Sequence, residues 1–99
     1  MSFYLTHKAK ADLQSIGRYT AIKWGINQRN IYLTQIDRCF HDLSDSPDLG
    51  RVCDFIRKGY RKYKVGKHLI FYRHAGADQI EIVRILHERM DVKIHLSGV

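Results

Sequence analysis

Apolar and polar residues alternate in two runs near the C-terminal end of the chain, on either side of a turn that contains glycine. The runs cover residues 67–74 and 80–87, and the turn covers residues 75–79. Alternation with a period of two predicts two β-strands. In the first strand it separates two sets of side chains, Leu69, Phe71 and Arg73 on one face and Ile70, Tyr72 and His74 on the other.

The second run is apolar on both faces. Strict alternation places Ile82 and Leu86 on one face, and Val83 and Ile85 on the other. A strand that is apolar on both sides is typical of the inside of a sheet, covered on much of both faces. The run then gives way to a charged tail.

Helical spacing dominates the N-terminal half. Between Lys8 and Trp24, apolar positions recur three and four residues apart, which predicts one helix with a buried face. Thr6 can cap its start with the side-chain oxygen, and Gly25 can end it because glycine tolerates positive φ. The buried positions of this first helix are Ala9, Leu13, Ile16, Thr20 and Trp24.

A second helix follows after a very short link. Asn27 is the expected cap, and the helix is expected to end near Ser44. A link this short predicts two antiparallel neighbours, a helical hairpin. Its apolar stripe is Tyr32, Ile36, Cys39 or Phe40, and Leu43, and the large aromatic residues of both helices, Trp24, Tyr32 and Phe40, are expected in the core.

The remaining segments complete the fold class. Residues 2–5 read as a short strand, Pro47 stops the second helix, and residues 55–65 read as an extended stretch interrupted at Gly59. Strands joined by short turns are antiparallel, and a helical hairpin must cover one face of their sheet. The sequence predicts one α+β domain over residues 1–99, with an N-terminal antiparallel helical hairpin packed on a small antiparallel β-sheet.

The charge of the chain is strongly positive and unevenly distributed. Of the formal net charge of +7, residues 51–99 contribute +6, from 11 Lys or Arg and 5 Asp or Glu. This concentration favours an acidic partner, although a basic strand edge also serves to prevent edge-to-edge aggregation. The chain has no apolar run of the roughly 20 residues that span a bilayer and no signal-peptide layout, so a cytoplasmic protein is expected.

No cofactor is expected from the sequence. The two cysteines, Cys39 and Cys53, lack metal-type spacing, and the six histidines show no clustered ligand spacing. Neither a glycine-rich phosphate loop nor a nucleophile motif is present. We therefore expect no metal site and no catalytic residues.

Taken together, the chain resembles the ParE family of bacterial toxins, within the RelE/ParE superfamily. The resemblance runs nearly from end to end, and its last block is the most specific. The residues that carry it are Ala11, Asp12, Leu13, Ile16, Tyr19, Thr20, Trp24, Gly25, Gln28, Tyr32, residues 40–43, Pro47, Gly50, Arg51, and the blocks 56–59, 68–73 and 82–91.

The resemblance implies the toxin of a type II toxin–antitoxin pair. Toxins of this family are expected to inhibit DNA gyrase, through its GyrA polypeptide, by trapping the cleaved gyrase–DNA complex. A ParD-type antitoxin is expected to neutralise the toxin with a flexible C-terminal segment. On this interpretation the protein is not an enzyme, and direct nucleic-acid binding is not expected except through the antitoxin or gyrase.

Two sets of residues are candidates for these contacts. For gyrase we place the site at the end of the last strand and in the tail, at Arg84, His87, Glu88, Arg89, Met90 and Asp91. For the acidic antitoxin segment we expect charge contacts from Arg57, Arg61, Arg73 and Arg84.

The alternative function is a ribosome-dependent mRNA endoribonuclease of the RelE type. Cleavage by the 2′-hydroxyl needs a base, an acid and a cation at the phosphate, which His87, Glu88 and Arg73 could supply together with Arg84. This chain ends its last strand in His87-Glu-Arg-Met-Asp91. That ending resembles ParE rather than the nucleases.

Overall fold

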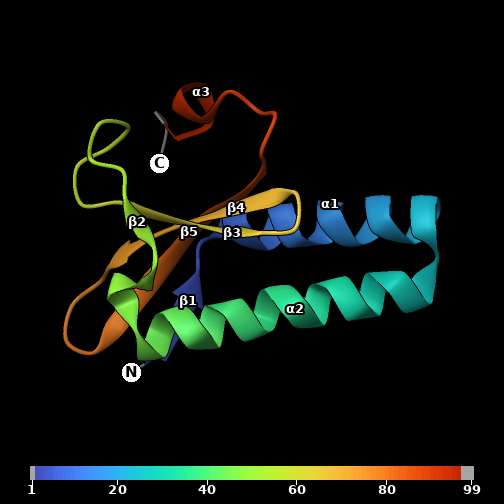
Figure 1. Cartoon of the computed structure of the whole chain (residues 1–99), viewed down its shortest axis with the longest axis horizontal. Helices are drawn as coiled ribbons and strands as arrows, with labels where there is room; N and C mark the ends of the chain where they lie inside the picture. The colour runs from blue at the N-terminus through green and yellow to red at the C-terminus, as the bar shows by residue number, and fades with distance from the viewer. Residues whose placement is uncertain (1, 97–99) are drawn as a thin grey trace.

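A helical hairpin and a five-stranded sheet make up most of the computed structural model, which describes residues 2–96 (Figure 1). The elements in chain order are β1 (Ser2–Leu5), α1 (His7–Trp24), α2 (Ile26–Asp45), the 3-10 helix η1 (Pro47–Leu49), β2 (Arg51–Val52), β3 (Arg61–Val65), β4 (His68–His74), β5 (Gln79–His87) and α3 (Val92–Leu96). This arrangement confirms the predicted α+β class with its N-terminal helical hairpin.

The strand order in the sheet is β1-β5-β4-β3-β2. The last four strands of the chain pair antiparallel, as their short turns require, and β5 lies inside the sheet as predicted. β1 instead pairs parallel to β5, with Phe3 opposite Ile80, so the complete sheet is mixed. No short turn joins these two strands, and nothing local therefore fixes their relative direction.

Local capping signals define the first helix, but not the second. The Thr6 side chain accepts a hydrogen bond from Ala9 N at 3.0 Å, and Gly25 ends α1 with φ of 95°. The expected cap at Asn27 is wrong, because α2 already begins at Ile26, directly after Gly25. Asn27 lies within the first turn of that helix, where a capping side chain has no role.

The core prediction for the aromatic residues holds for Phe40, which is 2% exposed, and in part for the half-buried Tyr32. It is wrong for Trp24, which is 64% exposed. The hairpin projects beyond the sheet, and Trp24 lies in the last turn of α1 at its free end (Figure 1). Helical spacing identifies the face of a residue, but it does not show where the covering sheet stops.

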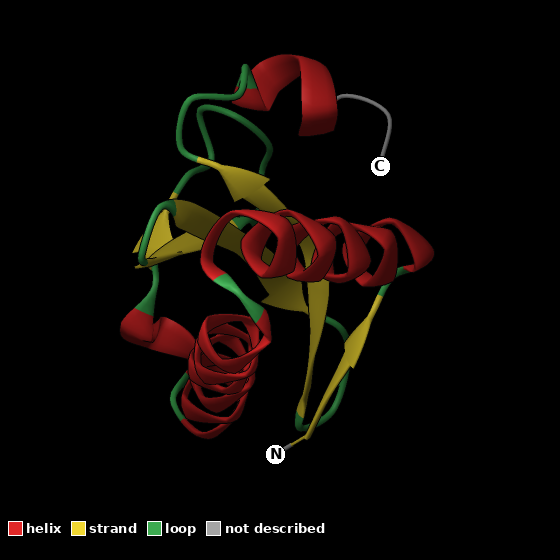
Figure 2. Ribbon diagram, turned by 90° about the vertical axis from the view of Figure 1, so that its right-hand side faces the viewer, coloured by secondary structure: helices red, strands yellow, loops and turns green. Residues whose placement is uncertain are grey.

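Each face of the sheet carries its own apolar cluster. The hairpin cluster joins both long helices to residues such as Ile70, Tyr72 and Ile85, whereas the α3 cluster joins Phe71 and Leu86 to the C-terminal helix. The two views show α2 and α3 on opposite sides of the sheet (Figures 1 and 2). The alternation predicted for β4 is therefore confirmed.

The strict alternation predicted for β5 is wrong, because a β-bulge interrupts this strand. Phe71 pairs with Arg84 while the next residue, Tyr72, pairs with Ile82, so Val83 is an extra residue in the ladder. After the bulge, each side chain of β5 lies on the face of the sheet opposite to the one that strict alternation predicts. Ile82 and Ile85 therefore both pack in the hairpin cluster, and Val83 and Leu86 both pack in the α3 cluster.

Two segments differ from the predicted elements. Residues 53–60 form a turn region between β2 and β3 rather than an extended strand, closed by the bond from Cys53 N to Tyr60 O at 2.9 Å. The charged tail leads into α3, whose Leu96 is 1% exposed. Across residues 2–96, no helix combines the length and apolar character required to cross a bilayer.

Candidate functional site

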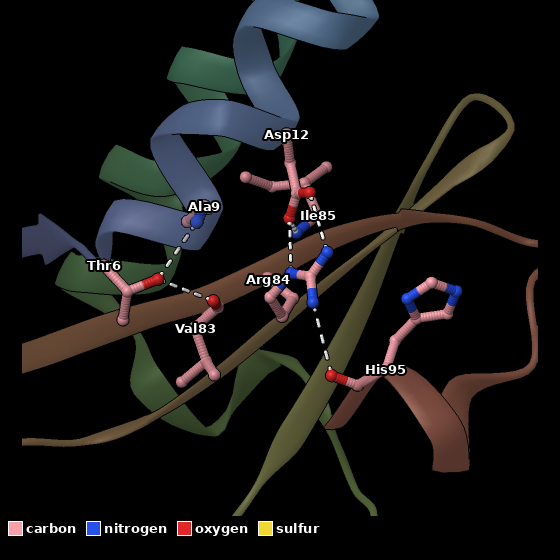
Figure 3. A network of polar contacts seen from close by, with 7 residues as sticks. All are labelled: Thr6, Ala9, Asp12, Val83, Arg84, Ile85 and His95. Atoms are coloured by element: carbon pink, nitrogen blue, oxygen red, sulfur yellow. Dashed lines mark hydrogen bonds and ion pairs between the residues drawn. The ribbon is translucent and has the colours of Figure 1, made fainter. Parts of the chain in front are cut away.

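Arg84 is held in place by an acid of the first helix. Its Nε and Nη2 lie 2.8 and 2.9 Å from the two carboxylate oxygens of Asp12, and its Nη1 donates to His95 O at 3.3 Å (Figure 3). Both side chains of the ion pair are 14% exposed. The hydrogen bonds with Asp12 raise the pKa of Arg84 above its usual value, so its charge is permanent. Arg84 therefore joins β5 to α1 and α3, and little of it is available to a partner.

The bulge that orients Arg84 is itself fixed by the start of α1. Thr6 Oγ1 donates to Val83 O at 2.8 Å while it accepts from Ala9 N (Figure 3). Asp12 Oδ2 also accepts from Ile85 N at 2.9 Å. The backbone on both sides of Arg84 is thus bonded to α1 or to its cap. The end of β5 consequently has a rigid support.

His87 and Glu88, at the start of the tail, have internal partners. The His87 ring lies edge-on to His68, with 5.4 Å between ring centroids, and its Nδ1 accepts from Arg89 N at 3.1 Å. Glu88 pairs with Lys64 at 3.1 Å and Lys67 at 3.8 Å. The hydrogen bond with Lys64 is the main reason that the pKa of Glu88 is lowered.

His68 extends this arrangement towards the second helix. Its Nδ1 lies 2.6 Å from the Tyr32 hydroxyl, which also donates to Val65 O at 3.0 Å. Burial is the main cause that lowers the pKa of His68 below its usual value, and the neighbouring His87 adds to the effect. His68 is therefore neutral at physiological pH and acts in packing rather than as a cation.

The remainder of the tail, residues 89–91, is exposed, and its last residue also caps the helix that follows. Asp91 Oδ1 accepts from Lys93 N at 3.1 Å, which makes Asp91 the N-cap of α3. Arg89 is exposed, and Met90 is 46% exposed. Asp91 is also exposed, but its carboxylate is engaged in the cap, so Arg89 and Met90 are the exposed residues of the proposed gyrase set whose side chains have no role in capping.

The four arginines proposed for the antitoxin fall into two groups. Arg61, like Arg84, has internal partners: it donates to Gly50 O at 2.7 Å and pairs with Asp48 at 3.3 Å. Arg57 and Arg73 are exposed, although Arg73 Nε also bonds Glu81 at 2.8 Å. The structure brings Arg57 and Arg73 together in the wall of one pocket.

This cationic pocket, of about 810 Å³, opens on the face of the sheet that carries α3. The start of α1, the 57–60 turn and the adjoining ends of β4 and β5 form its walls. Its lining residues are Thr6, His7, Lys8, Arg57, Lys58, Gly59, Tyr60, Arg73, His74, Glu81 and Val83. A run of basic residues from Arg51 to Lys67, here called the basic run, is visible in the sequence, but its meeting with His7 and Lys8 depends on the parallel pairing of β1.

A second hollow, of about 470 Å³, lies between the two long helices. Gly17, Ala21 and Leu33 contribute apolar surface, and Arg18 and Arg29 contribute positive charge. Between Asp12 and Asp37 the sequence contains no acid, so this half of the hairpin is purely basic. We call this hollow the hairpin groove.

The side chains considered for chemistry have partners within the fold. Among residues 2–96, no three His, Cys, Asp or Glu side chains are grouped so that they could hold a metal ion. The four residues that could have served RNA cleavage are bonded within the fold: Arg73 to Glu81, Arg84 to Asp12, His87 to the Arg89 backbone, and Glu88 to two lysines.

Comparison with known proteins gives the family of the chain. The family described as "ParE toxin of type II toxin-antitoxin system, parDE" matches residues 3–92. Toxin ParE1 of Mycobacterium tuberculosis is 40% identical over 94 residues, covering 95% of this chain and 96% of the relative. Toxin ParE1 of Caulobacter vibrioides is 34% identical over 95 residues, covering 96% and 97%.

A solved structure shares the fold. It is described as a chromosomal ParDE TA system from P. aeruginosa, with a TM-score of 0.75 at 24% sequence identity, over 88% of this chain and 95% of that one. The family match extends over most of the chain, and the identities to its curated relatives reach 40%. The chain therefore belongs to the ParE family, the toxins of type II toxin–antitoxin systems.

Proposed function

We propose that this toxin inhibits DNA gyrase by binding and stabilising the cleaved gyrase–DNA complex, and that it is not a nuclease. Binding one state of the target better than another is sufficient to shift its population towards that state. The observation that carries the proposal is the tail. It presents Arg89 and Met90 outward from a rigid strand end, while Arg84, His87 and Glu88 are bonded to internal partners.

Within the proposed gyrase site, the six residues have different roles. Arg89 and Met90 make the contact, and arginine and methionine are both enriched in protein interfaces. Arg84, His87, Glu88 and Asp91 position them, through the Asp12 pair, the His68 ring, two lysines and the cap of α3.

The proposed regulator is a ParD-type antitoxin, whose C-terminal segment folds on the toxin. The hairpin groove offers such a segment apolar surface with a basic rim at Arg18 and Arg29. Arg57 and Arg73 are the exposed members of the predicted arginine set, and Arg61 and Arg84 support the surface from within. An acidic amphipathic segment would gain both apolar burial and ion pairs, which offset its ordering cost.

Supercoiling and DNA-cleavage assays with purified gyrase test the proposal. The wild-type toxin should block supercoiling and accumulate cleaved DNA, and the cognate antitoxin should reverse both effects. Arg89→Ala with Met90→Ala should remove the inhibition while circular dichroism and antitoxin binding remain unchanged. Transcript cleavage on translating ribosomes, without any effect on gyrase, would instead support the nuclease function.

Truncation after Leu86 is a poor substitute for these point variants. It would also delete Val92 and Leu96, which pack against the α3 cluster. The matched control is Lys93→Ala with Ile94→Ala, which changes one cation and one exposed apolar side chain in the neighbouring helix. If this control loses inhibition equally, the tail has no special role in binding gyrase.

A further inference from the structure

We propose that the cationic pocket binds backbone phosphates of the DNA held by gyrase, an inference that rests on the proposed function and adds a second contact to it. Phosphate contacts position a protein on DNA without reading its sequence. They require several cations close together. The pocket supplies these from three separate parts of the chain.

The lining of the pocket is positive after its one acid is counted. The lining contains one carboxylate, that of Glu81, and four cationic side chains, so its formal charge is +3. The four cations are Lys8, Arg57, Lys58 and Arg73. Both oxygens of this carboxylate are occupied, Oε1 by Arg73 Nε at 2.8 Å and Oε2 by the Tyr4 hydroxyl at 2.9 Å. Glu81 therefore holds Arg73 in the wall and offers little repulsion to an anion.

The start of α1 contributes to the same wall. Thr6, His7 and Lys8 line the pocket at the N-terminus of an 18-residue helix, and the first turn of this helix contains no acid. The positive end of a helix dipole favours phosphate groups. It reinforces the field of Arg57 and Lys58, which come from the turn on the other side.

The charges in the lining suit phosphate groups. The two buried members of the lining, Tyr60 and Val83, are only 6% and 1% exposed, so its charged residues dominate what the pocket can recognise. A phosphate group needs only the charge, because ion pairing and counterion release supply most non-specific affinity for DNA.

The position of the pocket also fits a target made of protein and DNA. Glu81 lies at the pocket end of β5, six residues before His87, where the tail begins. At about 3.3 Å per residue the two sites are roughly 20 Å apart. Arg57 Nη1 donates to Leu96 O at 3.1 Å, so the helix that follows the tail lies beside the pocket. One side of the toxin can thus meet gyrase and its DNA together.

Charge reversal at Lys58 tests the inference, because this residue is exposed in a turn and outside the proposed gyrase contact. Lys58→Glu is compared with Arg38→Glu, an identical charge change on an exposed position of α2, away from the lining. Binding is measured over a series of salt concentrations to gyrase alone, to gyrase with DNA, and to a fluorescent 20-base-pair duplex without gyrase. Circular dichroism checks that both variants fold.

We expect Lys58→Glu to weaken binding to the duplex and to the gyrase–DNA complex about fivefold or more, and to lower the slope of log K against log salt by about one. Binding to gyrase alone and the effect of Arg38→Glu should stay close to wild type. Equal behaviour of the two variants in both DNA-containing experiments overturns the inference. A wild-type toxin that leaves gyrase unaffected disproves the proposed function instead, and the duplex measurement still decides the role of the pocket.

Discussion

The Asp12 carboxylate uses both of its oxygens to connect elements that are distant in sequence. Through the Arg84 guanidinium and the Ile85 amide it fixes α1 against β5, and Arg84 extends the connection to the α3 backbone. Because both side chains are 14% exposed, water can replace few of these bonds. Removing one partner would leave the other charged group desolvated without compensation.

Asp12→Ala should therefore lower the free energy of unfolding by about 3 kcal/mol or more. For a domain of this size that corresponds to a fall in Tm of about 12 °C or more. Urea titration followed by circular dichroism measures the change. The matched control is Asp37→Ala, since Asp37 pairs with His41 at 3.5 Å on an exposed helix face where both side chains are 64% exposed. Its loss should be about 0.5 kcal/mol or less, and similar losses in the two variants would contradict the role given to Asp12.

At the scale of elements, α3 completes the second face of the sheet. Its Leu96 and Val92 pack with residues such as Phe71 and Leu86, while the preceding tail remains on the surface. The tail is therefore held at both ends, by β5 before it and by α3 after it. Its exposed residues can be replaced without opening an apolar cluster.

Leu96→Ala should destabilise the fold by about 2–3 kcal/mol, because it removes a side chain that is 1% exposed. Ile94→Ala, in the same helix but 69% exposed, should change stability by about 0.5 kcal/mol or less. Thermal unfolding of both variants gives the comparison. Equal effects would mean that α3 contributes little to the second cluster.

The elements found by sequence reasoning are those with local signals. The long helices follow from their periodicity, and Thr6 and Gly25 mark the ends of the first one. α3 was missed because five residues are too few to show a helical period. The Val83 bulge was missed because it is defined by pairing with β4 and by a bond to Thr6, contacts that no local pattern contains.

In the candidate sites, too, local features could be predicted from the sequence and long-range contacts could not. The tail and the basic run could be recognised along the sequence, whereas the internal partners of Arg61 and Arg84 could not, because Asp48 and Asp12 lie 13 and 72 residues away. Sequence reasoning consequently treated all four arginines proposed for the antitoxin as surface charges. Burial and pairing in the fold decide which of them can meet a partner.

On the scale of the whole molecule, the hairpin is longer than the sheet that it covers. α1 alone has 18 residues, or about 27 Å, and the greatest extent of the chain is 37 Å. The free end of the hairpin carries large exposed apolar residues, namely Tyr19, Ile22, Trp24 and Ile26. These side chains stabilise the isolated domain little, so they are free to change without loss of the fold.

Trp24 gives this free end an optical property, because it is the only tryptophan of the chain. An indole that already meets solvent should emit at long wavelength in the native state and be quenched readily by iodide. Its emission maximum should therefore shift little when urea unfolds the protein, even though the circular dichroism signal is lost. The same fluorescence should shift to shorter wavelength whenever an added protein covers the end of the hairpin, and Trp24→Phe provides the blank. A large red shift on unfolding would show that the indole is buried in the native protein.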